Sequence, residues 1–375
     1  MHPGYSECRS DSPIISHWAI ATTGALVRST GADSMQYRTL GRTGIKVTPY
    51  ALGAMMLGGF GNPDRQEGIR ILHRALDGGI NFVDTADRYG DSEEVVGEAL
   101  KGRRDDVVLA TKFSGAVDDD VNHRGASRRW ITQAVERSLH RLQTDYIDLY
   151  QLHRPDPDTD IDETLSALTD LVRQGKVRAI GTSSMRGSEI VEAQWTSERR
   201  GFERFRTEQP NYSIIDREIE REILPVVERY GMGALVYSPL AGGTLTGRYR
   251  AGQENDNFRS TKSGMHHFRD ERRLAAVEEL IALSEEIGVK LPHMAMAFVI
   301  AHPGVTSAIA GPRTMEQLDD TLAGIDVALS DEVLNRIDEI VPPGESIGAL
   351  DMVYRGPEVG DRTLRRRPLA ERSAA

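Results

Sequence analysis

The chain has 375 residues, of which 39 % are apolar and 27 % are charged, a composition typical of globular proteins rather than disordered ones. The net charge of −11 is spread along the chain without an obvious basic face, which argues against a nucleic-acid-binding protein. The single cysteine, Cys8, excludes an internal disulfide framework and favours a reducing compartment, so we expect a cytoplasmic protein. No apolar run reaches the ~18 residues of a membrane-spanning helix, so we expect no membrane association.

The two ends of the chain differ from its middle. Residues 1–34 show no periodicity and lack the basic start and long apolar core of a secretory signal, so we expect a disordered leader. Well-patterned sequence follows Met35, the start we expect for the natural protein. Residues 346–375 are basic and aperiodic at their end and are expected to form a frayed tail. The ordered domain is therefore predicted to span residues 35–345.

The ordered domain begins with a predicted β-hairpin followed by eight strand-like runs. The hairpin joins residues 36–41 to residues 46–50 through a turn that contains Gly44. Each later run is short and apolar, as buried strands are. In chain order the eight runs are Ala51–Met55, Ile80–Val83, Val107–Thr111, Tyr146–Leu152, Val177–Gly181, Arg206–Gln209, Ala234–Tyr237 and Thr306–Ala310.

Segments with helical spacing separate most of these runs. They are Arg65–Asp77, Ser92–Lys101, Arg129–Arg141, Ile161–Gln174, Gly187–Arg199, Ile219–Tyr230 and Thr314–Gly324. A long loop is expected after the seventh strand, from Ser238 to about Asp270, and a last helix at Asp331–Ile340. Strands that alternate with helices indicate a parallel sheet, which could be doubly wound. Eight such units favour a closed (β/α)8 TIM barrel.

Polar residues gather at the ends of the predicted strands, where such barrels place their active sites. Asp84 ends the second strand and is followed closely by Tyr89, while Lys112 and His153 end the third and fourth. Taken singly, each has a structural alternative, such as a turn residue, a solvated loop charge or a structural histidine. Together, from three consecutive strands, they are expected to converge on one rim.

These four side chains suit one kind of chemistry. A tyrosine phenol is a weak acid, and a nearby ammonium ion such as Lys112 makes its proton easier to transfer. Asp84 would hold Lys112 in place, and His153 could orient a substrate oxygen by a hydrogen bond. The set suits protonation of a carbonyl oxygen while hydride adds to carbon. No side chain can supply hydride, so a nicotinamide cofactor is required.

In their order along the chain, several motifs resemble those of the aldo-keto reductase family. They are "FVDTADRYG", "LATK", "DLYQLHRP", "GTSS", "EQPNYS", "YSPLAGGTLTGRY" and "AGPRTMEQL". The resemblance spans about residues 35–343 and is greatest to the bacterial branch that also resembles potassium channel β-subunits and aryl-alcohol dehydrogenases. It implies a catalytic tetrad of Asp84, Tyr89, Lys112 and His153, with Tyr89 as the proton donor.

The resemblance also implies a nicotinamide cofactor bound along the barrel rim. Its carboxamide would be held by Ser183, Ser184 and Gln209, although the family usually has asparagine where this chain has Ser184. Thr321 likewise replaces a frequent asparagine near the adenosine. Basic residues in the set favour NADPH, with NADH left open. The other implied cofactor contacts are Met55, Asp84, Tyr237, Ser238, Pro239, Leu240, Gly242, Arg248, Arg259, Gly311, Arg313, Gln317 and Asp320.

The expected function is therefore an NADPH-dependent reductase of aldehydes or ketones, reversible toward alcohol oxidation. Two alternatives are a cofactor-binding regulatory subunit like the channel β-subunits and a structural barrel that has lost its cofactor. No metal site is expected, and homo-oligomers are left open. The substrate would be a small-molecule carbonyl compound, in a mostly apolar pocket formed by Met55, Met56, Phe60, Phe113 and Arg154. Arg154 would suit an anionic substituent.

Overall fold

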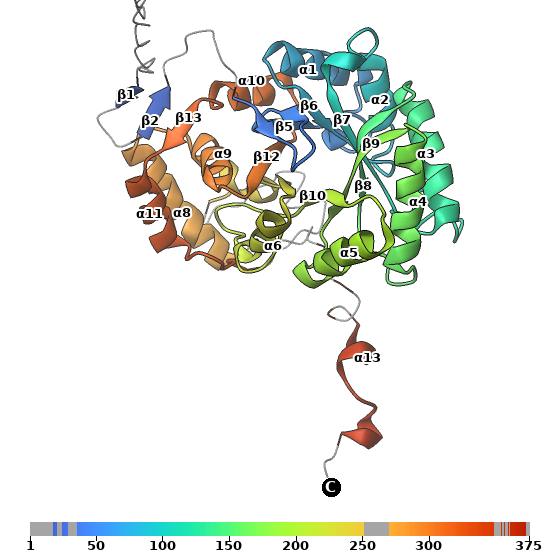
Figure 1. Cartoon of the computed structure of the whole chain (residues 1–375). Helices are drawn as coiled ribbons and strands as arrows, with labels where there is room; N and C mark the ends of the chain where they lie inside the picture. Colours follow the sequence, from blue (N-terminus) through green and yellow to red (C-terminus); the bar gives the residue numbers. More distant parts are fainter. Residues whose placement is uncertain are drawn as a thin grey trace, which may run out of the picture.

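A closed barrel of eight parallel strands, surrounded by helices, forms the centre of the protein (Figure 1). The computed structural model describes residues 18–20, 25–28, 36–250, 270–348, 354, 356, 359 and 361–372. The first and last barrel strands pair with each other, Tyr50 lying opposite Ala308, and this pairing closes the barrel. In chain order the strands are β5 (Tyr50–Gly53), β6 (Phe82–Asp84), β7 (Val108–Phe113), β8 (Ile147–Leu152), β9 (Val177–Ser183), β10 (Phe205–Gln209), β11 (Gly233–Val236) and β12 (Val305–Ala310).

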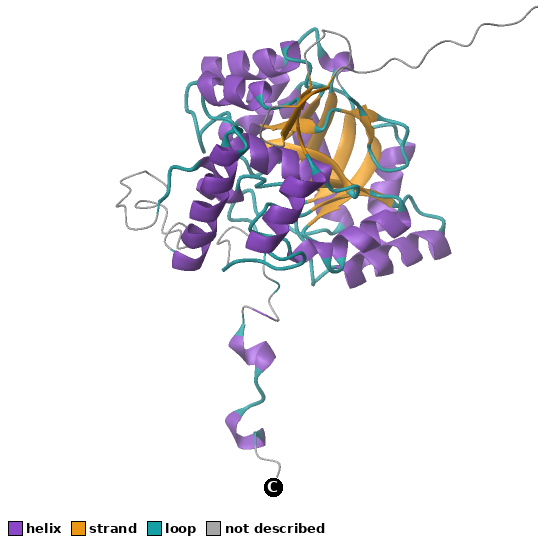
Figure 2. Cartoon of the chain, turned by 90° about the vertical axis from the view of Figure 1, so that its left-hand side faces the viewer, coloured by secondary structure: helices purple, strands orange, loops and turns teal. Residues whose placement is uncertain are grey.

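The helices cover the outside of the barrel, as Figure 2 shows with the strands in orange and the helices in purple. The predicted (β/α)8 barrel is confirmed, and the doubly wound alternative is wrong because the sheet closes on itself. The main helices are α1 (Arg65–Asp77), α2 (Ser92–Ala99), α3 (Arg128–Leu142), α4 (Ile161–Arg173), α5 (Gly187–Arg200), α6 (Ile223–Tyr230), α8 (Glu271–Glu286), α9 (Leu291–Ala301), α10 (Met315–Ala323) and α11 (Asp331–Ile340).

The barrel interior and the helix layer form two separate apolar cores. Inside the barrel, Phe82, Leu149 and Leu235 are completely buried. The predicted hairpin, β3 (Arg38–Thr39) and β4 (Lys46–Val47), adds Leu40 and Val47 to this inner core. The larger core lies between the strands and the helices. Since burying one such side chain contributes about 1.5–3 kcal/mol, the two cores together provide the rigid frame for the strand ends.

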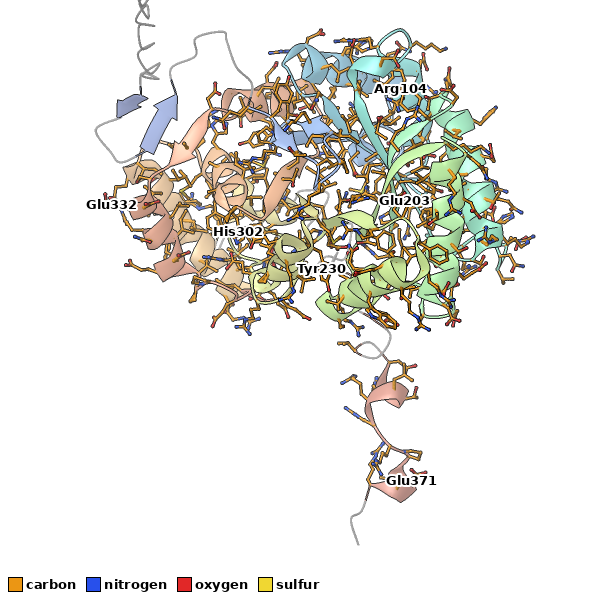
Figure 3. The ribbon with its side chains drawn as sticks, in the orientation of Figure 1. Arg104, Glu203, Tyr230, His302, Glu332 and Glu371 are labelled. Carbon is orange, nitrogen blue, oxygen red and sulfur yellow. The ribbon has the colours of Figure 1, made fainter. Side chains whose placement is uncertain are left out.

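Arg104, labelled in Figure 3, connects the amino ends of β7 and β8 by hydrogen bonds to the carbonyls of Val107 and Tyr146. Its Nη2 donates to the carbonyl of Tyr146 at 2.9 Å and to Oδ2 of Asp148 at 2.7 Å. Its guanidinium carbon also lies 3.9 Å from the centre of the Tyr146 ring. Polar groups at this end of a barrel contribute to stability, which leaves chemistry to the opposite end.

Helices α8 and α9 lie between β11 and β12 in the chain, after the expected long loop, in a stretch to which the sequence pattern assigned no element. Helix α9 has the apolar sequence "LPHMAMAFVIA" and no polar face, so helical periodicity does not reveal it. The loop itself begins with the short helix η4 (Ala241–Thr246). Its residues 251–269 lie outside the described part of the chain.

Two strands in the N-terminal stretch differ from the disordered leader expected there. Strand β1 (Trp18–Ile20) pairs with β2 (Ala25–Arg28), and β2 pairs with β13 (Val327–Leu329), antiparallel in both cases. Among the described strands β13 pairs with β2 alone, so β2 uses an edge of β13 that no other described strand occupies. In the expected tail, α13 (Arg362–Arg365) and Glu371 lie away from the barrel (Figure 3). Within the described residues, no helix has both the length and the apolar character that crossing a membrane requires.

Candidate active site

A cavity of about 540 Å³ opens at the carboxyl ends of the barrel strands. It is continuous from the end of β6 to the start of α10, so it can hold an extended molecule as well as a second, smaller one. Most of the residues expected from the sequence line it. They are Met55, Asp84, Tyr89, His153, Ser183, Gln209, Tyr237, Ser238, Pro239, Leu240, Gly242, Arg248, Gly311, Arg313, Gln317 and Asp320.

Asp84 and Lys112 form an ion pair at the floor of this cavity. Lys112 Nζ donates to Oδ1 of Asp84 at 2.5 Å and to the carbonyl oxygen of Thr85 at 2.8 Å. The two side chains come from neighbouring strands, β6 and β7, and are only 4 % and 0 % exposed. The charge of Lys112 is therefore held in one place beneath the cavity.

The second oxygen of Asp84 is held by two glutamine side chains. Gln209 Nε2 donates to Oδ2 at 2.9 Å, and Gln151 Nε2 donates to the same atom at 3.2 Å. All three residues are buried. Because charge-assisted hydrogen bonds of this kind are strong, the Asp84 carboxylate is fixed in position against Lys112.

Tyr89 projects over this ion pair from the turn between β6 and α2. Its hydroxyl lies 3.4 Å from Nε2 of His153, and the two rings meet edge to face. Lys112 Nζ lies 5.3 Å from the centre of the Tyr89 ring. The turn is held by the backbone, since the N–H of Asp87 donates to the carbonyl of Lys112 at 3.1 Å. The four expected residues therefore meet at one point.

His153 is neutral in this position. Burial lowers the pKa of His153 well below its ordinary value, and the positive charges of Lys112, Arg154 and Arg88 lower it further. Its Nδ1 is buried and has no hydrogen-bond partner among the described residues. The tautomer with hydrogen on Nε2 can therefore donate one hydrogen bond into the cavity, toward the same point as the Tyr89 hydroxyl.

The backbone is strained around the rim of the cavity. Of the described non-glycine residues, five have a positive φ, and four of these follow the ends of β7, β9 and β11: Ser114, Ser184, Ser238 and Ala241. Just beyond them, Gly242 and Gly243 also have positive φ, at 69° and 111°. Such strain concentrates at functional sites. Glycines in such conformations let the backbone approach a ligand closely.

The far end of the cavity, at α10, carries charged groups. Arg313 lines the cavity, and its backbone N–H donates to Oε1 of Gln317 at 2.9 Å. Asp320 accepts from Lys290 Nζ at 2.5 Å. Burial opposes ionisation of Asp320, but Lys290 and His293 nevertheless hold the pKa of this carboxyl below its ordinary value.

Ser183 and Ser184, after β9, lie next to Arg154. Arg154 Nη1 donates to Ser184 Oγ at 2.6 Å, and Ser183 Oγ donates to the carbonyl of Gln209 at 2.9 Å. Ser184 does not itself line the cavity, unlike Ser183. Tyr237 faces the same region, and burial raises the pKa of its phenol, which the positive charge of Arg154 partly offsets.

Some expected residues lie elsewhere. Lys112 is buried beneath the cavity rather than on its wall. Phe113, expected on the pocket wall, instead packs against Tyr150 in the helix layer, with ring centres 4.7 Å apart. It points outward because neighbouring residues in a strand face opposite sides, and Lys112 faces inward. Arg259 lies outside the described residues. Asp87 lies in the turn between β6 and α2 and is buried there.

Several cavity residues were not identified from the sequence. Gln151, which does not line the cavity but holds Asp84 beneath it, was also missed, although it lies two residues before His153 and therefore on the same face of β8. His293 and Met296 line the cavity from α9, a helix that its sequence pattern does not reveal.

Comparisons with known proteins point to the same family as the sequence motifs do. Residues 50–342 match the model of the Aldo/keto reductase family. The chain belongs to this family. It is 40 % identical to an uncharacterized oxidoreductase of Bacillus subtilis (strain 168), YrpG, over 83 % of this chain and 97 % of that protein. It is 37 % identical to the aldo-keto reductase YhdN of the same organism, over 76 % of this chain and 87 % of that protein.

Another relative is described as a probable voltage-gated potassium channel subunit beta, from Oryza sativa subsp. japonica. It is 34 % identical, over 82 % of this chain and 97 % of that protein. The expected resemblance is therefore confirmed, and the aldo-keto reductase fold carries an oxidoreductase activity here. The family generally uses NAD(P)H, and the cavity fits such a group: it offers polar side chains at one end, glycine backbone in the middle and Arg313 at the other.

Proposed function

We propose that the protein is an NADPH-dependent reductase of aldehydes or ketones in which Tyr89 is the proton donor. The observation that carries this proposal is the meeting of the Tyr89 hydroxyl and His153 Nε2, 3.4 Å apart, above the buried Lys112–Asp84 pair. The carbonyl oxygen of a substrate placed between these two groups would receive a hydrogen bond from each.

Each side chain has its own role in the proposed carbonyl reduction. The bound nicotinamide supplies hydride to the carbonyl carbon. His153, held neutral, donates a hydrogen bond that orients the carbonyl oxygen and polarises the bond. Tyr89 then transfers its phenolic proton to that oxygen, and the positive charge of Lys112 beneath the ring stabilises the phenolate that forms. Asp84 holds Lys112 in position throughout.

Ser183, Ser184 and Gln209 are proposed to hold the carboxamide, and Tyr237 to stack against the nicotinamide ring. The loop that begins at Ser238 and contains Arg248 would cover the pyrophosphate. Arg313 lines the cavity at α10, and no described carboxylate pairs with its guanidinium. A guanidinium in that position suits the 2′-phosphate of NADPH. Asp320, which could otherwise favour the ribose hydroxyls of NADH, is engaged by Lys290.

A second candidate function is a cofactor-binding regulatory subunit. The likeness to a protein described as a probable voltage-gated potassium channel subunit beta motivates it. The complete tetrad favours the enzyme, because a binding module needs the cofactor but has no need of a proton donor facing a substrate site.

The test measures oxidation of NADPH at 340 nm by the purified chain with a panel of aryl and aliphatic aldehydes and ketones. The proposal predicts turnover with at least the reactive aldehydes. Binding of NADPH without turnover of any member of the panel would favour the regulatory subunit instead.

A further inference from the structure

Arg154 places a positive charge in the half of the cavity that faces the tetrad. It follows His153 directly in the chain and lines the same cavity as Tyr89 and His153. Its guanidinium carbon lies 6.0 Å from the centre of the Tyr237 ring and 5.7 Å from that of Tyr354. Two aromatic rings and its backbone neighbours thus define the position of this side chain.

Only one nitrogen of the Arg154 guanidinium, Nη1, forms hydrogen bonds with other described residues. Nη1 donates to Ser184 Oγ at 2.6 Å, to the carbonyl of His153 at 3.0 Å and to Ser183 Oγ at 3.3 Å. Nε and Nη2 have no acceptor among the described residues, and they are not among the buried atoms without a partner. Their N–H groups therefore remain accessible for a ligand.

No described carboxylate forms an ion pair with Arg154. Glu208 is the carboxyl group whose pKa the charge of Arg154 lowers. The oxygens of Glu208 accept hydrogen bonds from Thr182 Oγ1 and from the N–H of Met185, not from Arg154. Burial raises the pKa of Glu208 to about 7, against these hydrogen bonds and the charge of Arg154. The geometry thus pairs Glu208 with Thr182 and Met185 rather than with Arg154.

Arg88 adds a second positive charge at the mouth of the cavity. The Arg88 side chain is exposed and lies against Gly115. Any residue larger than glycine at position 115 would push the Arg88 side chain away. Among the described residues it has no carboxylate partner. Both Arg88 and Arg154 lower the pKa of His153, so their fields reach the place where the substrate oxygen binds. The cavity is also lined by the apolar side chains of Met55, Met56 and Phe60.

We propose that the substrate is an aldehyde or ketone with a carboxylate on an apolar skeleton, and that Arg154 binds this carboxylate through Nε and Nη2. The inference rests on the proposed reductase function. A planar carboxylate matches two parallel N–H donors of a guanidinium, and the pair forms a strong charge-assisted interaction. Arg88 assists from the mouth by its charge, while the apolar wall holds the carbon skeleton.

The experiment compares substrates of the same shape with and without the charge. We would measure kcat/KM with NADPH for 3- and 4-carboxybenzaldehyde and for the 3- and 4-nitrobenzaldehydes, whose nitro group has the shape of a carboxylate but no net charge. The ratio of the carboxy to the nitro value is determined for the wild type, Arg154→Gln and Arg154→Lys. Since the same ratio is compared between proteins, differences in intrinsic aldehyde reactivity cancel.

In Arg154→Gln we expect the ratio for at least one isomer to fall on the order of 10–100-fold, the loss typical of a charged hydrogen-bonded pair. Arg154→Lys should lie between the two, because lysine keeps the charge but not the planar donors. The dissociation constant of NADPH, from fluorescence, reports separately on any effect on the cofactor of losing the contacts of Arg154 with Ser183 and Ser184. Arg313→Gln is the matched control: it should weaken NADPH binding and leave the ratio unchanged.

An unchanged ratio in Arg154→Gln would overturn the inference and leave the proposed reductase intact. Equal losses for both substrates, together with weaker NADPH binding, would also overturn it and would assign Arg154 to the cofactor. Absence of turnover of every benzaldehyde by the wild type, in a protein that binds NADPH, would overturn the proposed function together with the inference.

Discussion

Lys112 and Asp84 form a buried ion pair in which Nζ lies 2.5 Å from Oδ1. Both oxygens of Asp84 are occupied, Oδ1 by Lys112 and Oδ2 by Gln209 and Gln151. Removing two charges from water is costly, so each partner of such a pair depends on the other. The pair therefore links the stability of the barrel rim to the chemistry proposed for Tyr89.

Lys112→Met should destabilise the protein as well as inactivate it. It leaves the Asp84 carboxylate buried without its cation, which costs about 3–5 kcal/mol in comparable cases. Urea denaturation at pH 7 measures the change in the free energy of unfolding. The double variant Asp84→Asn/Lys112→Met removes both charges and should recover part of the loss. Equal stability of the single and double variants would show that the ion pair does not act as described.

Asp87→Asn should change how stability depends on pH. Burial, and then the neighbouring Glu93, raise the pKa of Asp87 to about 8, and neither carboxyl oxygen has a hydrogen-bond partner among the described residues. Its usual pKa is about 4, so between pH 4 and 8 the folded protein binds a proton that the unfolded chain has lost. The contribution of Asp87 to stability is complete below pH 4 and is lost as the pH rises through 8.

Thermal unfolding of wild type and Asp87→Asn at pH 5 and pH 8 tests this expectation. Asparagine carries no charge, so the variant should gain stability relative to the wild type as the pH rises from 5 to 8. Asp106→Asn, at an exposed aspartate, serves as the control and should show no such gain. A constant difference in melting temperature at the two pH values would mean that Asp87 is ionised in the folded protein.

Arg313→Gln should reduce the preference for NADPH over NADH. Losing one arginine–phosphate contact should lower kcat/KM for NADPH on the order of 10–100-fold and leave that for NADH within about threefold. Steady-state rates with both cofactors and one aldehyde give the ratio. The exposed Arg178, which donates to the carbonyl of Gly175 at 3.3 Å, provides a control as Arg178→Gln. Equal losses for both cofactors would remove Arg313 from 2′-phosphate recognition.

Ser184→Asn should strengthen cofactor binding. Ser184 has a φ of 60°, a conformation that asparagine tolerates better than most residues, and asparagine adds two N–H donors. The dissociation constant of NADPH should therefore fall, whereas in Ser184→Ala it should rise because the hydroxyl is lost. Weaker binding in Ser184→Asn would indicate that the contact between Arg154 and Ser184 matters more than the added donors.

The tetrad could be predicted from the sequence because each of its residues lies at or shortly after a recognisable apolar strand. Asp84, Lys112 and His153 come at or directly after short apolar strands, and the parallel alternation brings these strand ends to one rim. Tyr89 is separated from Asp84 by only four residues of turn, so it cannot lie far away. Local pattern and topology together were sufficient for these residues.

Other parts of the site depend on contacts that no local pattern reveals. Phe113 was expected on the pocket wall, but the inward direction of Lys112 turns it outward. Helix α9 is apolar on all sides, so periodicity gave no sign of it or of the cavity residue His293. Asp87 lies in the turn after β6, and packing of that turn buries it, which no local pattern reveals. Strand β13 pairs with β2 across a large sequence separation.

Tyr89→Phe tests the central claim most directly, because it removes one hydroxyl and keeps the ring over Lys112. The measurement is kcat for an aldehyde that the wild type reduces, together with the dissociation constant of NADPH. We predict that kcat falls on the order of 10²–10⁴-fold, the contribution typical of a positioned proton donor, while NADPH affinity stays nearly unchanged. A variant that reduces the aldehyde at the wild-type rate would contradict the assignment of Tyr89 as the proton donor.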